Sequence, residues 1–172
     1  MHREAEGGGE RGGIRDAALD LATELRRLGV EAKIAAPGVP MPTVDAAAAA
    51  MEVAPERILK SVLFQAADGR CVMAIASGRA RIDAKRLATL ADLPRVRLAS
   101  PEVVLAMTGY PAGGTPPIGH RERFPVFLDT RAASIDWAWG GGGREELLLR
   151  VTPELIVRLT GARVESVTME NF

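Results

Sequence analysis

The first candidate for chemistry in this sequence is Lys60, a single ammonium group inside the otherwise apolar run 58–64. Side chains alternate along a strand, so Lys60 would share a face with Ile58, Val62 and Phe64. A compact cation among apolar neighbours suits the binding of a phosphate, a carboxylate or a substrate carbonyl. The alternative is that Lys60 lies at the entry of the strand and extends its ammonium into water.

The second candidate is the segment 108–120, Thr-Gly-Tyr-Pro-Ala-Gly-Gly-Thr-Pro-Pro-Ile-Gly-His. Its glycines and prolines predict a loop rather than a helix or a central strand. Glycines would let backbone N–H groups approach an anion or a developing oxyanion closely. A plain connector is the competing interpretation. His120 could act as a general base, although a lone histidine beside arginines is commonly a surface residue.

A third feature is the basic segment 79–97, which holds six basic and two acidic residues, a net charge of +4. Such a segment could follow a nucleic-acid backbone. A solvated helix face would show the same pattern. The basic residues are Arg79, Arg81, Lys85, Arg86, Arg95 and Arg97, and the acids are Asp83 and Asp92.

Several other kinds of site are not supported. The sequence has no Gly-x-Ser-x-Gly motif and no paired histidines for a metal. The run Gly140–Gly143 lacks the spacing of a dinucleotide-binding loop. The single cysteine, Cys71, excludes an intramolecular disulfide and fits a reducing compartment. Trp137 and Trp139 fit a core or a pocket wall better than a base-stacking platform.

The bulk composition is that of an ordinary globular protein. Its 172 residues suffice for one domain, and 47% are hydrophobic. Basic and acidic residues balance at 22 each, so the global charge does not indicate a polyanionic partner. Residues 1–13 are rich in glycine and charge, which predicts a disordered tail before a domain at 14–172. We expect no membrane segment.

The positioning elements can be predicted from periodicity and turn signals. Asp68-Gly69 predicts a hairpin, and Thr43, Asp83, Ser100 and Thr152 are expected to cap helices. Helices are expected at 14–28, 43–51, 83–90, 100–109 and 152–161, and strands at 32–36, 58–65, 70–76, 96–98, 124–128, 137–139, 147–151 and 163–168. A turn is expected at 140–143. Hairpins interleave with helices, which predicts an α+β domain around a mixed or largely antiparallel sheet.

With these residues in view, the sequence resembles the YbaK/prolyl-tRNA synthetase-associated domain family. The stretch 55–64 is similar to the family's lysine-bearing strand, and 108–120 is similar to its signature loop. Segments 83–87, 98–102 and 152–161 continue the resemblance, which extends from about residue 43 to 168. One departure is Glu146, where the family pattern would have another glycine.

The resemblance implies an aminoacyl-tRNA deacylase that removes a wrong amino acid from tRNA in trans, without a metal or other cofactor. It implies aminoacyl-tRNA as substrate, with tRNA-Pro carrying a small residue as the first candidate. Prolyl-tRNA synthetase is a further candidate partner, and a cytoplasmic location is expected. Lys60 corresponds to the functional lysine. The implied substrate-binding residues are Ser61, Gly113, Gly114, Pro117, Gly119, His120, Gly141 and Gly143, and the candidate tRNA contacts are Arg79, Arg81, Lys85 and Arg86.

We expect Lys60 to position the terminal ribose or phosphate, with loop amides near the ester carbonyl and a positioned water as nucleophile. No side chain in the sequence stands out as a general base. Two alternatives remain open at this stage. One is a non-catalytic tRNA- or synthetase-binding module of the same fold, to which Glu146 gives some support. The other is hydrolysis of small free aminoacyl esters or amides.

Overall fold

The structure is a computed structural model that describes residues 18–31 and 33–170; the predicted tail at 1–13 lies outside the described residues. The described α-helices are α1 (Leu21–Arg27), α2 (Val44–Met51), α3 (Ala84–Leu90), α4 (Pro101–Thr108), α5 (Thr130–Ala133) and α6 (Pro153–Thr160), with 3-10 turns η1 (Pro55–Arg57) and η2 (Ala112–Gly114). The strands are β1 (Lys33–Ala35), β2 (Leu59–Ala66), β3 (Cys71–Ser77), β4 (Val96–Leu98), β5 (Val126–Asp129), β6 (Ala138–Gly141), β7 (Leu148–Val151) and β8 (Arg163–Glu165).

The main sheet has five strands in the order β4-β2-β3-β5-β8. β2 pairs antiparallel with β3 and β4, whereas β5 is parallel to both β3 and β8. Because β3 lies in the middle and both its faces are covered, all of its residues are buried. The sheet is therefore mixed, and the predicted α+β fold is confirmed.

Alternation along the strands divides the core into two layers. One face of β2 and β3, which includes Leu59, Leu63 and Met73, packs with residues of α1, α4, α5 and α6. The opposite face, which includes Phe64 and Ala74, packs with α3. Lys60 therefore has the strand parity of the α3 face, and Ser61 has the parity of the other face.

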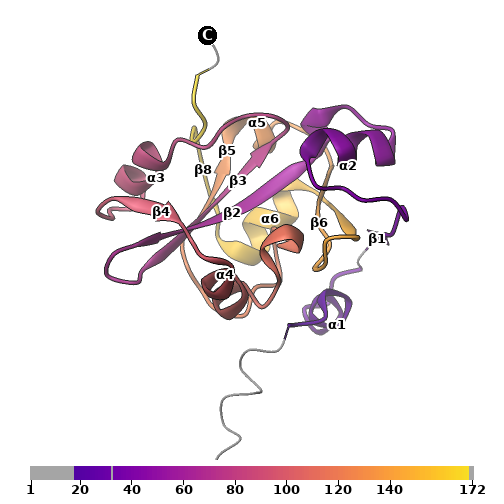
Figure 1. Cartoon of the computed structure of the whole chain (residues 1–172), viewed down its shortest axis with the longest axis horizontal. Coiled ribbons are helices and arrows are strands. Elements are labelled where there is room, and N and C mark those ends of the chain that lie inside the picture. Colours follow the sequence, from indigo (N-terminus) through magenta and orange to yellow (C-terminus); the bar gives the residue numbers. More distant parts are fainter. Residues whose placement is uncertain (1–17, 32, 171–172) are drawn as a thin grey trace, which may run out of the picture.

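A second, three-stranded sheet has the order β1-β7-β6 and is antiparallel throughout. It meets the main sheet at a bridge between Ile58 and Trp139, and both residues pack in the small core under α2. Figure 1 shows α3 and β4 at the left, β2 and β3 across the middle, and α2, β6 and β1 at the right. The junction of the two sheets, at Ile58, thus lies two residues before Lys60.

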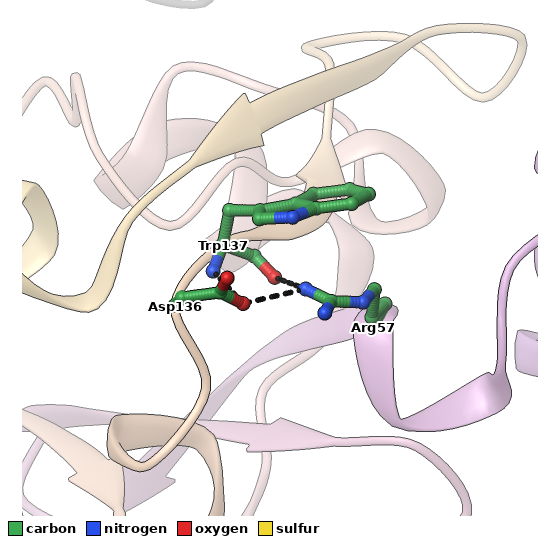
Figure 2. A network of polar contacts seen from close by, with 3 residues as sticks. All are labelled: Arg57, Asp136 and Trp137. Carbon is green, nitrogen blue, oxygen red and sulfur yellow. Dashed lines mark hydrogen bonds and ion pairs between the residues drawn. The ribbon is translucent and has the colours of Figure 1, made fainter.

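Arg57 fixes this junction from below (Figure 2). Its guanidinium donates hydrogen bonds to the Asp136 carboxylate at 2.8 Å and to the Trp137 carbonyl at 2.9 Å. It also lies 4.3 Å from the centroid of the Trp137 ring, where a cation–π interaction is favourable. Arg150 approaches the same ring at 4.3 Å. These contacts hold the start of β6 against η1 and so set where β2 begins.

The predicted helix starts are confirmed at Thr43, Asp83, Ser100 and Thr152, whose side chains each accept a hydrogen bond from a backbone N–H in the first turn. The start of the first helix was placed too early, because Asp20 caps α1 and the chain at 18–20 is not helical. Residues 14–17 lie outside the described part. Within residues 18–31 and 33–170, none of the helices combines the length and apolar character needed to cross a membrane.

The glycine run after Trp139 was also wrongly predicted as a turn. Gly140 and Gly141 belong to β6 and pair with Leu149 and Leu148, so the connection to β7 begins only at Gly142. Strand pairing overrides the low strand propensity of glycine here, because β7 offers a full set of backbone partners.

Candidate active site

A cleft of about 310 Å³ lies between the two sheets, and we call it the lysine cleft. Four segments form its walls: the entry to α2, the start of β2, the η2 loop and the β6–β7 connection. The lining residues are Met41–Val44, Ala47, Ile58–Val62, Ala112, Gly113, Thr115, Gly141, Glu145, Leu147 and Leu148.

Lys60 brings the positive charge of the lysine cleft. Its side chain is partly buried and forms neither a hydrogen bond nor an ion pair with the described residues. Burial lowers the pKa of the ammonium below its ordinary value, and the positive charge of Arg81 lowers it further. A cation without a counter-ion in a partly desolvated cleft is suited to binding an anion or a developing negative charge.

The backbone of β2 at Ser61 also lines the cleft. Gly78 donates to the Ile58 carbonyl at 2.8 Å and Ala66 donates to the Arg70 carbonyl at 2.9 Å, so the even-numbered residues of β2 bond to β3. The N–H and C=O of Ser61 must therefore point to the other edge. On that edge the contact with β4 begins at Leu63, whose carbonyl accepts a hydrogen bond from the Ala99 N–H at 2.9 Å, and β6 bridges to β2 at Ile58. Ser61 lies in the interval between these two contacts and lines the cleft.

The Ser61 side chain adds a second unusual feature. Its hydroxyl oxygen is fully enclosed and has no hydrogen-bond partner among the described residues. Buried polar atoms usually have a partner, and exceptions are often associated with functional sites. The structure thus places Ser61, one of the predicted substrate-binding residues, in the lining of the same cleft as Lys60.

The predicted glycines hold two loops together at backbone distance. A Cβ on Gly141 would lie 2.2 Å from the Thr115 carbonyl oxygen, and one on Gly114 would lie 2.6 Å from the Arg144 backbone. Gly143, at φ +93°, donates a hydrogen bond to the Gly114 carbonyl at 2.8 Å. The signature loop and the β6–β7 connection therefore fit together only because these positions lack side chains.

Gly113 and Gly141 line the lysine cleft itself, whereas Gly114 and Gly143 are buried behind it. Pro117 packs behind as well, with its Cδ 2.8 Å from where a Gly140 Cβ would be. Gly114, Gly143 and Pro117 therefore support the wall of the cleft and do not line it.

Gly119 and His120 lie elsewhere. They line a larger groove of about 700 Å³ between α1, the segment 119–126 and the end of α6, which we call the histidine groove. The His120 Nε2 lies 2.7 Å from the Pro116 carbonyl oxygen, so this nitrogen carries a hydrogen and donates it. Burial lowers the His120 pKa. The structure therefore does not bring His120 to the lysine cleft.

Of the candidate tRNA contacts, Arg81 is close enough to Lys60 to influence its pKa. Arg79 pairs with Asp45, in the first turn of α2, at 2.7 Å. Lys85 and Arg86 are exposed on α3, the helix that covers the Lys60 face of the main sheet. Arg81 is thus the candidate beside the cleft, whereas Arg79 lies against α2 and Lys85 and Arg86 lie on α3.

Sequence reasoning missed the far wall of the cleft, above all Glu145 and Met41. Glu145 lies four residues after Gly141, and its role as a cleft residue depends on the contact between the two glycine-bearing loops. The Gly-rich turn was a signal that something packs closely there, but it did not say what. Among the described residues, no group of three or more histidine, cysteine or acidic side chains is arranged to hold a metal.

The fold and the cleft define a class of protein: an α+β domain with a small charged cleft at the start of a central strand. Comparison with known proteins names the family. The sequence profile described as "Aminoacyl-tRNA editing domain" matches residues 39–159. The chain belongs to this family, as the resemblance predicted.

Three similar proteins illustrate the range of the family. The proline–tRNA ligase of Solidesulfovibrio magneticus is 36% identical over 121 residues, 69% of this chain and 20% of the ligase. The candidate Cys-tRNA(Pro)/Cys-tRNA(Cys) deacylase EbsC of Enterococcus faecalis is 25% identical over 126 residues, 73% of this chain and 77% of that protein. A solved structure, described as a candidate trans-editing enzyme for prolyl tRNA synthetase, has a TM-score of 0.80 at 30% identity and covers 88% of this chain and 96% of that one.

The chain therefore spans about a fifth of the length of the proline–tRNA ligase it matches, but most of the length of the two stand-alone relatives.

Proposed function

We propose that this protein hydrolyses the ester bond between a wrong amino acid and its tRNA. The observation that carries the proposal is the partly buried Lys60 ammonium, which has no partner among the described residues, in a cleft of about 310 Å³ between the start of β2 and the two glycine-bearing loops. The family supports it, since editing of aminoacyl-tRNA is what its description names. The match to stand-alone relatives over most of their length supports action in trans.

Hydrolysis of an aminoacyl ester needs little activation by the protein, because the ester is already reactive. A water oxygen bonds to the ester carbonyl carbon, the bond to the ribose oxygen breaks, and that oxygen takes a proton to leave free tRNA and the amino acid. Lys60 supplies positive charge near the ribose or phosphate and toward the developing oxyanion. The Ser61 backbone and the loop around Gly113 orient the aminoacyl group at the strand edge.

The basic residues extend this site to the tRNA body. Arg79, Arg81, Lys85 and Arg86 are exposed; Arg81 is close enough to Lys60 to lower its pKa, and Lys85 and Arg86 lie on α3, which packs on the sheet face that has the parity of Lys60. Surface cations so arranged would contact phosphates of the acceptor end. The names of the relatives favour tRNA-Pro as the tRNA and prolyl-tRNA synthetase as a partner in the same process.

The experiment is deacylation of a panel of tRNAs, chiefly tRNA-Pro charged with Ala, Cys or Ser, by wild type and Lys60→Ala. Rapid hydrolysis of one species that depends on Lys60 is the expected result, and it names the amino acid removed. Binding of tRNA without hydrolysis of any species would overturn the proposal in favour of a binding module. Hydrolysis that is indifferent to the tRNA body would instead identify an esterase for small aminoacyl compounds.

A further inference from the structure

The lysine cleft also carries a negative charge that the proposed mechanism does not use. Glu145 is the acidic residue in its lining, and the carboxylate forms no ion pair or hydrogen bond with the part of the chain that the structure describes. Its neighbour Glu146 differs, because it pairs with Arg144 at 3.2 Å. Both side chains are exposed, but Glu146 is paired with Arg144, whereas Glu145 has no partner among the described residues and lines the lysine cleft where it opens to solvent.

The position of Glu145 is set by the glycine-packed loops. Gly141 and Gly143 fix the β6–β7 connection against the signature loop, as described above. The Glu145 side chain then lies over Gly113, with Oε1 2.7 Å from where a Gly113 Cβ would be. The same carboxylate lines an adjoining hollow formed with Pro40–Pro42. The Glu145 carboxylate therefore lies at the border between the lysine cleft and this hollow. Gly113 leaves room for it because it has no side chain.

Glu145 does not serve as the counter-ion of Lys60. The two form no ion pair, and the influences on the Lys60 pKa are burial and Arg81, both of which lower it. A free cation and a free anion thus share a cleft of about 310 Å³. This arrangement complements a ligand that carries charges of both signs at separate points.

An aminoacyl ester on tRNA is such a ligand. Its carbonyl and nearby phosphate attract the cation, while its α-ammonium group requires a hydrogen-bond acceptor, preferably a charged one. We propose that Glu145 binds the α-ammonium of the aminoacyl group and so selects substrates with a free amino group. This inference rests on the proposed function, since it assigns a further contact in the same site.

The carboxylate could instead act as a general base on the attacking water, or remain a solvated rim charge. These roles differ in what they require of the substrate. An ammonium-binding carboxylate matters only when the ammonium is present, a base matters for every ester, and a rim charge matters for none. The α-amino group is therefore the part of the substrate to change.

The experiment uses the full chain with tRNA-Pro charged with alanine, or with whichever amino acid the panel shows to be removed fastest, in two forms: with a free amino group and N-acetylated. Wild type, Glu145→Gln, Glu145→Asp and the matched control Glu146→Gln are compared by kcat and KM. Acetylation also alters the intrinsic reactivity of the ester, but equally for every variant, so the ratio between variants isolates the contact.

We expect Glu145→Gln to lower kcat/KM for the free-amine substrate about tenfold, mainly through KM, and to leave the N-acetylated substrate within about twofold. Glu145→Asp should recover part of the loss, and Glu146→Gln should resemble wild type. Gly113→Ala should reproduce the loss, because the new methyl group displaces a carboxylate that is free to move.

Equal losses of kcat for both substrates would overturn the inference in favour of a general base, and no loss for either would leave Glu145 a rim charge; both results retain the proposed function. Absence of hydrolysis by wild type on the whole panel would overturn the proposed function and this inference with it.

Discussion

The histidine groove and the lysine cleft differ in a way that size does not reveal. The histidine groove, at about 700 Å³, is more than twice the volume of the lysine cleft, at about 310 Å³. In the groove the partly buried His120 is engaged by Pro116, and the charges without a partner among the described residues, such as Arg123 and Arg158, are exposed. In the cleft the partly buried Lys60 has no partner among the described residues, and neither has the enclosed Ser61 hydroxyl.

The comparison teaches that free interaction capacity, rather than volume, marks the reactive site. Folding normally satisfies buried polar groups, so unsatisfied polar groups at a cavity wall indicate where a ligand can bind. The groove instead holds a histidine whose proton is committed to the fold. The predictions below contrast these two regions, beginning with the largest expected effect.

Replacing Lys60 in the lysine cleft and His120 in the histidine groove should affect kcat/KM very differently. We expect Lys60→Met to lower kcat/KM for the mischarged tRNA about 100-fold or more, because the charge that stabilises the oxyanion is lost. His120→Gln should change it less than about threefold. Deacylation kinetics with both folded variants measure the contrast. A larger loss for His120 than for Lys60 would reverse the comparison and move the site to the groove.

Salt should separate the cations around the two hollows. If Lys85 and Arg86 contact phosphates, replacing either by Gln should reduce the slope of log(kcat/KM) against log salt by about one. Arg123→Gln and Arg158→Gln, which remove exposed cations of the histidine groove, should leave the slope unchanged. If all four variants kept the slope of wild type, neither surface would follow the tRNA backbone.

The alkaline limit of activity should report the pKa of Lys60. Because burial and Arg81 both lower it, the ammonium loses its proton at a pH below the ordinary range for lysine, and activity should fall there as pH rises. Arg81→Gln should shift this limit to higher pH, since one of the two causes is removed. Profiles of kcat/KM against pH, which report ionisation in the free enzyme, test it. A limit that does not move, or moves to lower pH, would contradict the assignment.

The histidine groove should respond to acid through stability rather than activity. The folded chain holds His120 neutral, with its pKa lowered by burial, whereas the unfolded chain takes up the proton near pH 6.5. The unfolded state then binds more protons, so the free energy of unfolding should decrease as pH falls through about 6.5. Urea titrations at pH 7.5 and 5.5 of wild type and His120→Gln measure it, and the variant should lose less.

The smallest effect is expected at Ser61. Its enclosed hydroxyl has no partner among the described residues, so Ser61→Ala removes an unsatisfied group and should leave the free energy of unfolding unchanged or raise it by up to about 1 kcal/mol. Chemical denaturation gives this value. A loss of stability above about 1 kcal/mol would indicate that the hydroxyl is satisfied in solution. Thr108→Ala is the contrasting control, because that hydroxyl donates to Val104 at 2.7 Å and should be costly to remove.

Much of the fold was predictable because local signals determine it. The caps at Thr43, Asp83, Ser100 and Thr152 and the turn at Asp68-Gly69 depend on residues within a few positions of each other. The glycines of β6 were misassigned for the opposite reason. Their conformation is set by pairing with β7, and sequence patterns of glycine predict turns unless the partner strand is known.

The candidate site was predictable only in part. Lys60 and Gly113 were identified from an unusual residue in an apolar strand and a Gly-Pro loop, and the structure places both in one cleft. Glu145 could not be identified, because its place depends on two loops that meet through backbone contacts between residues about 30 positions apart. Gly119 and His120 were assigned to substrate binding from their place at the end of the loop, but the chain leaves the lysine cleft after Thr115 and both residues line the histidine groove.

The stretch of β2 between its bridge to β6 at Ile58 and its contact with β4 at Leu63 has a consequence for the solubility of the protein. A strand edge with unpaired backbone groups is a template on which a second chain can add, and natural sheets usually shield such edges. Here the entry to α2 and the η2 loop line the cleft together with Leu59–Val62, so they shield this stretch of the strand. Shortening the segment before α2 should therefore favour self-association before it improves access to the cleft.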